Sequence, residues 1–471
     1  MSALGEAVGA AARRAPDAPA LHWRGESVPW RDLGIRATSA GALLRRLAPG
    51  TENRVIALAT GSSRVMAAFA YACAFAGVTF MPLNPALPRE RREALLAAAG
   101  DPIRFGEGER DPAPVLDAFS RTADAAPDHP APPPGVELVI ATSGSGGEPK
   151  GVMFAPGNLR AAAQASAGRL PLAPGDAWLA CLPLYHIGGM AILHRCALGG
   201  AAVVLHQGFD AARVLDDLAG YSVTHLSVVP PMLDRLVRTG PPPPALRAAL
   251  VGGGELSLPL YRRARASGWP VLPTYGLTET CAQVATQEAP GDDWIPGDVG
   301  RPLPGIQVDV PVADAEGVGR IRVRGATVMQ GYLNPDRRPG EGAEQGVFLT
   351  ADLGRVDARG HLVVLGRADD MLVSGGVNVH PAEAERLLLR APGVAEAAVT
   401  GRRDPVWGEV LVAVYRGEAA APELEAWCRQ HLPGHLRPRD FLRREALPFS
   451  PQGKLDRRAL RRLAEGAGQK R

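Results

Sequence analysis

Short apolar runs alternate with stretches of helical periodicity along most of the chain. In the first 125 residues, apolar runs such as VIALAT (55–60) and GVTFMPL (77–83) stand between such stretches. This alternation predicts α/β units on a largely parallel sheet. The most apolar run, VMAAFAYACAFAGVTFMPL (65–83), is interrupted by Gly77 and Pro82. It therefore predicts a buried helix followed by a buried strand, and not a membrane span.

The alternation resumes after a proline-rich connector at 126–135. Amphipathic segments near 211–219 and 231–239 predict two helices, and the apolar segments around them predict strands. These expected strands are VELVIAT (136–142), AAVVLH (201–206), THLSVV (224–229), ALVGGG (249–254) and PVLPTYG (270–276).

The pattern changes after residue 305. Between 305 and 365, the segments IQVDV, GRIRVRG and GHLVVLG predict strands with little helix, which indicates a β-rich subdomain. After GRADDMLVSGG (366–376), the remaining residues predict a small α+β unit of about 100 residues, a usual size for an independent domain. The predicted fold class is α/β, with a large N-terminal domain of α/β subdomains plus the β-rich subdomain (1–367) and a small C-terminal domain (368–471).

Composition narrows the class of partner. The 471 residues carry 52 Lys and Arg against 49 Asp and Glu, a net charge of +3, which argues against nucleic acid or an acidic membrane as the main partner. The five cysteines are scattered and form no CxxC pair, as is typical of reduced thiols in a cytoplasmic protein. The first residues lack the pattern of a signal peptide. We therefore expect a cytoplasmic protein, with no stable membrane insertion.

The stretch ATSGSGGEPKG (141–151) follows an expected buried strand and combines three hydroxyls with a lysine. Glycine-rich loops of this kind expose backbone N–H groups that can hold phosphate oxygens, although a surface turn has a similar composition. The P-loop signature GxxxxGK[ST] is absent, because Pro149 precedes Lys150 and Gly151 follows it. A P-loop NTPase is therefore excluded.

Four further segments carry groups suited to nucleotide binding. TYGLTET (274–280) offers hydroxyls and a carboxylate beside Gly276, TADLG (350–354) offers Asp352, GRADD (366–370) offers Arg367, and SPQGKLDRRAL (450–460) offers Lys454. Hydroxyls suit phosphate oxygens, and carboxylates suit Mg²⁺ or ribose hydroxyls. Each segment alone could be a turn, a helix cap or a solvated charge. Their occurrence together, in this order, favours a nucleotide site.

The order and wording of these motifs resemble the ANL superfamily of adenylate-forming enzymes, which includes acyl-CoA synthetases, luciferases and peptide-synthetase adenylation domains. TSGSGGEPKG (142–151) is similar to the family motif [ST]SG[ST]TGxPKG, and the family's YGxTE, TGD, GRxDD and GK motifs find counterparts at 275–279, 350–352, 366–370 and 453–454. Gly146 and Ala351 depart from the family pattern, which usually has threonine and glycine there.

The resemblance implies ATP, Mg²⁺ and coenzyme A as ligands and a small-molecule carboxylate as substrate. A carboxylate would first be joined to AMP, and coenzyme A would then displace AMP. Lys454, Thr278, Glu279 and His186 would be catalytic, with Glu279 holding the metal. The implied nucleotide and coenzyme A contacts are Thr142, Ser143, Gly144, Ser145, Gly147, Lys150, Gly252, Gly253, Gly254, Glu255, Tyr275, Gly276, Asp352, Arg367, Gly375 and Gly376.

The family implies a mobile C-terminal domain, because the thiol must reach a centre that Lys454 has covered. The implied hinge is Asp369, and Gly375-Gly376 would line the pantetheine tunnel, where glycine lets a thin chain pass close to the backbone.

Segments 182–211 and 274–287 further resemble o-succinylbenzoate–CoA ligases of menaquinone biosynthesis. His186 would then lie at the acyl pocket, and Arg195, or its neighbour His194, would receive the second carboxylate of the substrate. Three alternatives stay open: another acyl- or aryl-CoA ligase, a stand-alone enzyme that loads a carrier protein, and a non-catalytic ligand-binding homologue. A homodimer is also possible.

Overall fold

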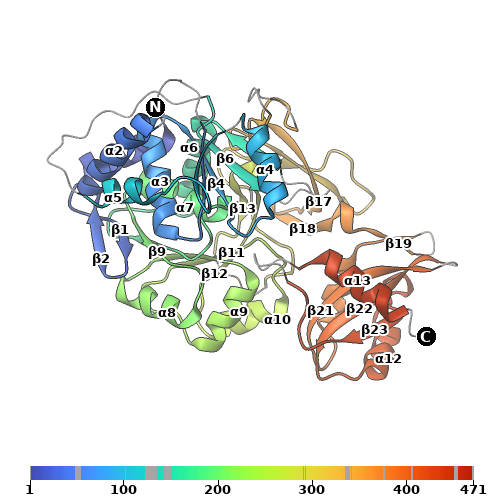
Figure 1. Cartoon of the computed structure of the whole chain (residues 1–471). Helices are drawn as coiled ribbons and strands as arrows, with labels where there is room; N and C mark the ends of the chain where they lie inside the picture. The colour runs from blue at the N-terminus through green and yellow to red at the C-terminus, as the bar shows by residue number, and fades with distance from the viewer. Residues whose placement is uncertain are drawn as a thin grey trace.

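The computed structural model describes residues 2–47, 55–100, 102–121, 135–142, 150–289, 291, 293–334, 340, 342–374, 377–404, 407–449 and 455–468. Figure 1 shows a large body formed by the N-terminal three quarters of the chain, with a smaller C-terminal part, in red, beside it. This division into a large N-terminal body and a smaller C-terminal part agrees with the expected α/β fold class.

One sheet of the large body has the strand order β16-β7-β6-β4-β3-β5. Its strands are β3 (Val55–Ala59), β4 (Thr79–Leu83), β5 (Ile103–Gly106), β6 (Leu138–Thr142), β7 (Lys150–Phe154) and β16 (Gly331–Tyr332). The first four run parallel, whereas β7 is antiparallel to β6 and β16 is antiparallel to β7. Thr142 and Lys150, at the two ends of the predicted phosphate loop, are therefore paired across neighbouring strands.

The second sheet has the order β13-β12-β11-β10-β8-β9-β1-β2. Its strands are β1 (Pro19–Trp23), β2 (Glu26–Pro29), β8 (Ala177–Ala180), β9 (Ala202–Leu205), β10 (His225–Val228), β11 (Ala248–Val251), β12 (Val271–Leu277) and β13 (Ala282–Thr286). Only the outer strands β2 and β13 pair antiparallel with their neighbours. The strands expected between 201 and 276 are confirmed, but the hairpin β1–β2 was not expected in this sheet.

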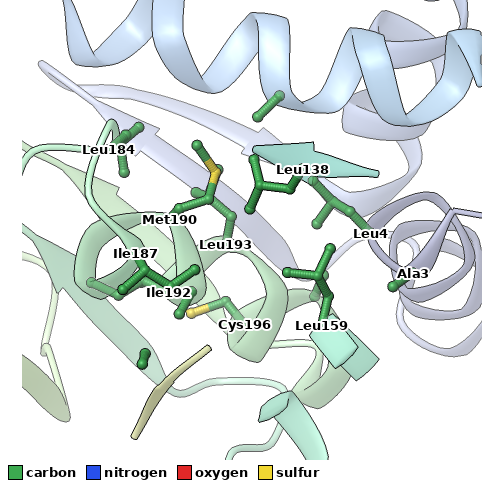
Figure 2. Close-up of a cluster of buried hydrophobic side chains, with 14 of the residues drawn as sticks. Ala3, Leu4, Leu138, Leu159, Leu184, Ile187, Met190, Ile192, Leu193 and Cys196 are labelled. Carbon is green, nitrogen blue, oxygen red and sulfur yellow. The ribbon is translucent and has the colours of Figure 1, made fainter. Parts of the chain in front are cut away.

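Helices fill the space between the two sheets and cover their outer faces. The main core joins residues of both sheets with α1 (Ala3–Arg14), α2 (Trp30–Leu47), α3 (Ser63–Ala76), α5 (Ala113–Ser120), α6 (Pro156–Arg169) and α7 (Ile187–Gly199). The outer face of the second sheet packs on α8 (Ala211–Gly220), α9 (Pro230–Thr239) and α10 (Leu258–Ala266), and that of the first sheet on α4 (Arg89–Ala98). Figure 2 shows Leu4, Leu138, Leu159 and Leu193 meeting in the main core.

The apolar run at 65–83 forms the predicted helix and strand. Ser62 accepts a hydrogen bond from the Val65 N–H at the start of α3, and Gly77 ends the helix with a left-handed φ of 71°. The residues of α3 from Met66 to Ala76 are buried, which explains why this helix is apolar on all sides.

The β-rich subdomain is confirmed as an antiparallel sheet of order β14-β15-β17-β18. Its strands are β14 (Gln307–Asp309), β15 (Gly319–Arg324), β17 (Val347–Val356) and β18 (Leu362–Arg367). Two short 3₁₀ turns, η1 (Thr278–Thr280) and η2 (Ala368–Asp370), carry predicted site residues.

The C-terminal part is the expected α+β unit. Its elements are β19 (Leu372–Ser374), β20 (Val377–Val379), α11 (Pro381–Leu388), β21 (Val394–Asp404), β22 (Gly408–Gly417), α12 (Ala421–His431), η3 (Gly434–Leu436), β23 (Asp440–Arg443) and α13 (Arg457–Gly468). A hydrophobic core of its own runs from Leu372 to Leu436. The domain boundary at 367/368 stays a prediction.

All five cysteines are buried free thiols. None of the helices in the described ranges combines the length and the apolar character that a bilayer crossing requires.

Candidate functional site

The residues of TYGLTET lie where β12 ends and η1 begins. β12 is the last strand of the parallel run in its sheet, and ligands of open α/β sheets bind beyond such carboxyl ends. An added Cβ on Gly276 would lie 1.5 Å from the Ala282 carbonyl oxygen, so only glycine permits the approach of β12 to β13 here. Thr278 and Glu279 follow in η1, and both are half-buried.

Three of the predicted ribose and adenine residues are joined by hydrogen bonds. The Tyr275 hydroxyl donates to Asp352 Oδ2 at 2.6 Å, and Arg367 Nη1 lies 3.3 Å from Asp352 Oδ1. Arg367 and Asp352 face each other across β17 and β18. The other guanidinium nitrogen of Arg367 donates to Asp369 at 2.7 Å, which links the predicted ribose site directly to the predicted hinge.

Electrostatics keeps the Tyr275 phenol protonated. Burial raises its pKa well above the usual value, and the neighbouring Asp352 carboxylate raises it further. Asp352 is itself buried, and its backbone N–H donates to the Thr350 hydroxyl at 3.0 Å. A buried carboxylate held by a phenol and a guanidinium has the fixed orientation needed to accept hydrogen bonds from paired ribose hydroxyls.

The predicted adenine-side residues Gly252–Glu255 form the loop after β11. An added Cβ on Gly252 would lie 2.7 Å from the Thr274 side chain, so this loop passes close to β12. The Glu255 carboxylate accepts a hydrogen bond at 3.0 Å from Nε of Arg386 in α11, which belongs to the C-terminal part. The loop therefore contacts both parts of the molecule.

A second cluster surrounds Glu279. The Tyr332 hydroxyl donates to Glu279 Oε1 at 3.1 Å, and Lys150 Nζ lies 4.5 Å from the centroid of the Tyr332 ring. Thr142 lies opposite Lys150, and its hydroxyl is 3.4 Å from the Lys150 carbonyl oxygen. The structure thus brings together residues of two predicted motifs, 141–151 and 274–280, and Tyr332, which sequence reasoning missed, connects them.

The donor set at Glu279 suits Mg²⁺. Among the described residues, no cluster of three or more His, Cys, Asp or Glu side chains could hold a metal on its own. Mg²⁺ commonly takes one or two protein carboxylates and completes its shell with water and substrate phosphates. A single half-buried carboxylate beside Thr278 matches this coordination preference, whereas it would not suit a structural zinc site.

The predicted acyl-pocket residues lie on or next to α7. His186 is the residue before the helix, and its ring meets Tyr185 edge-on at 4.8 Å. Arg195 lies nine residues later, buried, with its guanidinium 5.3 Å from the Trp178 ring centroid. Arg195 and His194 line a small cavity with Cys281, two residues beyond Glu279. The cavity has a volume of about 10 Å³, enough for a water molecule.

Arg195 has an unusual electrostatic setting. No carboxylate of the described residues pairs with it, and burial lowers its pKa to about 10. Burial also raises the pKa of the neighbouring Cys281 thiol to about 12, so this thiol stays neutral and supplies no anion. A buried cation without a counter-ion is costly and suits a site that an anionic ligand completes.

Several predicted residues lie outside the described ranges: Ser143, Gly144, Ser145 and Gly147 of the phosphate loop, Gly375 and Gly376 of the predicted tunnel, and Lys454. Their roles stay predictions.

Comparison with known proteins identifies the family. The sequence profile named AMP-binding enzyme matches residues 8–333, and the profile named AMP-binding enzyme C-terminal domain matches 383–454. The chain is 40% identical over 333 residues to a 2-succinylbenzoate–CoA ligase of Bacillus velezensis, covering 69% of this chain and 68% of the relative. It is 38% identical over 332 residues to the ligase of the same name from Bacillus subtilis, with the same coverage.

Solved structures of similar proteins support the same family assignment. The o-succinylbenzoate CoA synthetase of Bacillus subtilis in complex with its acyl-adenylate intermediate superposes with a TM-score of 0.85 at 30% identity, covering 96% of this chain and 97% of that one. The same protein with ATP and magnesium ion gives a TM-score of 0.83 at 30% identity, covering 96% and 98%. These matches confirm what the motifs indicated: the chain belongs to the family of AMP-binding, adenylate-forming enzymes.

Proposed function

We propose that this enzyme is a 2-succinylbenzoate–CoA ligase of menaquinone biosynthesis. The relatives above are ligases of this name, and one of them binds an acyl-adenylate, ATP and magnesium. The observation on this chain that carries the substrate assignment is the buried Arg195, which pairs with no carboxylate of the described residues and lines a cavity beside the Glu279 segment. A substrate with a second carboxylate would supply the missing anion.

The reaction has two balanced steps. A carboxylate oxygen of the substrate attacks the α-phosphorus of ATP, and pyrophosphate leaves, which yields acyl-AMP. The sulfur of coenzyme A then attacks the acyl carbon, AMP leaves, and the thiol proton passes to solvent. Both steps bring negative groups together, so the protein contributes chiefly by positioning and charge stabilisation.

We assign the nucleotide contacts accordingly. Lys150 would neutralise the terminal phosphates, Thr278 would bond the α-phosphate, and Asp352 with Arg367 would bind the ribose. Gly252–Glu255 and Tyr275 would line the adenine. Glu279 would hold Mg²⁺, which when bound offsets the charge of the phosphate oxygens.

The direct test measures both half-reactions separately. Pyrophosphate exchange into ATP is measured with o-succinylbenzoate, benzoate and a short fatty acid, and AMP release is then measured with coenzyme A present. We expect o-succinylbenzoate to give the highest kcat/KM in both assays. Exchange with another acid alone would identify a different acyl-CoA ligase. Exchange without a coenzyme A step would indicate carrier-protein loading, and no exchange would indicate a non-catalytic homologue.

A first prediction concerns Lys454. The C-terminal domain is proposed to bring Lys454 to the α-phosphate only for adenylation. Lys454→Ala should lower acyl-AMP formation at least 100-fold and change thioester formation from supplied acyl-AMP less than threefold, consistent with removal of one charge-stabilising donor. Equal losses in both half-reactions would refute this division of labour.

We also propose that the enzyme acts in the cytoplasm, where ATP and coenzyme A are available and thiols such as its five free cysteines stay reduced. A homodimer is a further proposal that sedimentation equilibrium would test.

A further inference from the structure

Tyr332 connects two nucleotide-binding elements that are far apart in sequence. It lies in β16, which pairs antiparallel with β7 so that Tyr332 is opposite Val152, two residues after Lys150. Its hydroxyl donates to Glu279 Oε1, and its ring lies 4.5 Å from Lys150 Nζ. One side chain therefore touches both the proposed metal carboxylate and the proposed phosphate lysine.

The Tyr332 segment is held firmly on both sides. The Leu333 N–H donates to the Gly151 carbonyl at 2.7 Å, and the Met329 N–H donates to the Glu279 carbonyl at 2.8 Å. Gly342 lies against the ring, since an added Cβ there would be 2.4 Å from Tyr332 Cε2. The backbone of Glu279 and its side chain are thus fixed by the same short segment.

The hydrogen bond from Tyr332 engages one of the two oxygens of the Glu279 carboxylate. The bond occupies Oε1 of the carboxylate and fixes the plane of the group. A carboxylate has further lone pairs, so Oε2 stays open to a ligand.

We propose that Tyr332 is a positioning residue that orients the Glu279 carboxylate for Mg²⁺ and holds the Lys150 ammonium against the face of its ring. The inference rests on the proposed role of Glu279 in metal binding. Fixing the carboxylate before the metal arrives removes an ordering cost from metal binding. The ring contact attracts the ammonium of Lys150 and limits the volume that this flexible side chain explores.

The test separates the hydroxyl from the ring. Mn²⁺ binding is measured by electron paramagnetic resonance on protein saturated with a nonhydrolysable ATP analogue, and binding of the analogue without metal is measured by calorimetry. Tyr332→Phe should weaken Mn²⁺ binding about tenfold, because one hydrogen bond to a charged group is lost, and should leave metal-free nucleotide binding unchanged. Tyr332→Leu should additionally weaken metal-free nucleotide binding severalfold, because Lys150 loses its aromatic support.

Tyr221→Phe is the matched control. It removes a phenol that accepts from the Gly25 N–H at 3.1 Å, and we expect it to leave both affinities unchanged. Unaltered Mn²⁺ affinity in Tyr332→Phe would overturn the inference. The inference would also be overturned if Tyr332→Phe lost thermal stability and metal-free nucleotide binding together with Mn²⁺ affinity, because that result would mark Tyr332 as merely structural. Glu279→Gln is measured alongside: if it too left Mn²⁺ affinity unchanged, the proposed metal site itself would fail. Neither readout requires the enzyme to accept o-succinylbenzoate.

Discussion

Two carboxylates that we assign to nucleotide binding each accept a hydrogen bond from a tyrosine. Tyr275 holds Asp352 on the ribose side, and Tyr332 holds Glu279 on the metal side. A phenol is well suited to this task, because its pKa rises beside a carboxylate and it stays a donor where a histidine would titrate. Both acids are thus oriented before any ligand arrives.

Arg195 provides the sharpest prediction at the residue scale. If it pairs with the second carboxylate of the substrate, Arg195→Leu leaves a buried anion without a partner, which costs about 3–5 kcal/mol. We expect kcat/KM for o-succinylbenzoate to fall at least 100-fold and that for benzoate to change less than threefold. Stability should not suffer, since the variant also removes a buried cation that no carboxylate of the described ranges pairs with.

Arg195→Lys serves as the companion variant. It retains the charge but loses the bidentate geometry, so it should recover part of the o-succinylbenzoate activity. Equal losses with both acids would instead assign Arg195 to the support of Trp178. The cavity admits a water molecule, so binding of a carboxylate also requires neighbouring side chains of α6 or α7 to move.

At the scale of elements, a buried acid anchors the first helix. Glu137, just before β6, accepts hydrogen bonds from the Ser2 hydroxyl and from the backbone N–H groups of Ala3 and Leu4 at the start of α1. A carboxylate at a helix N-terminus satisfies free donors and complements the helix dipole. Nε2 of His194, in α7, lies 3.9 Å from Glu137 Oε1, so Glu137 connects α1 with α7.

This anchor predicts an acid-sensitive contribution to stability. Burial alone would raise the pKa of Glu137, but His194 and the two backbone donors lower it below its usual value. A depressed folded-state pKa stabilises the fold above the unfolded pKa, and the stabilisation is lost as the pH falls through the folded value. Glu137→Gln should therefore cost about 2 kcal/mol at pH 7, and the difference from the parent should shrink toward pH 3.

Urea unfolding of both proteins at several pH values measures this difference. Glu90→Gln, an exposed acid in the first turn of α4, is the control and should change stability by less than about 0.5 kcal/mol. A Glu137→Gln effect that stayed constant with pH would show that the charge of Glu137 contributes nothing.

These elements also show what the sequence could and could not predict. The strands from 201 to 276 and the run at 65–83 were predictable, because their apolar residues follow local periodicities. The strand β7 was missed, since nothing local distinguishes a strand after a glycine-rich loop from a surface segment. Glu137 reads as an ordinary exposed acid until α1 is seen to meet it.

In the candidate site, too, local motifs were predictable from the sequence and long-range contacts were not. Motif residues could be named in order, but their pairing through Tyr332 depends on contacts between β16, β7 and η1. No spacing in the sequence encodes a contact of that range. Arg386 was missed for the same reason, because its partner Glu255 lies in another part of the chain.

At the scale of the whole molecule, the described residues provide few polar contacts that hold the C-terminal part in its present place. Arg386 pairs with Glu255, and its Nη2 donates to the Val364 carbonyl at 3.2 Å. A partly exposed ion pair contributes only about 0–1 kcal/mol, which is a weak restraint for a domain that is proposed to rotate.

Arg386→Ala should therefore shift the arrangement without unfolding either part. We expect the population of the arrangement described here to fall about fivefold relative to others, equivalent to about 1 kcal/mol. Fluorescence energy transfer between dyes on Val312→Cys and Glu423→Cys would measure it, because the native thiols are all buried. Arg390→Ala, an exposed arginine just after α11, is the control, and an identical response to both changes would contradict the prediction.

The hinge prediction is complementary. Asp369 lies in η2 and is tied to Arg367, and proline there would fix φ near −65°. Asp369→Pro should slow thioester formation at least tenfold while adenylation stays within threefold, the reverse of the pattern expected for Lys454→Ala. An unaltered coenzyme A step would place the hinge elsewhere.

The position of β1 has a consequence for how this chain is made. Leu21 of β1 pairs with Val203 of β9, so β1 is synthesised about 180 residues before the strand with which it pairs. At a synthesis rate of about 5–20 residues per second, that interval lasts roughly 10–40 s. During this interval, the β1–β2 hairpin has left the ribosome and one edge of β1 has no partner. When β9 emerges later, it too has an unpaired edge until it pairs with β1. Chaperone dependence and aggregation during expression should therefore respond to changes in this first hairpin more strongly than its distance from the nucleotide site suggests.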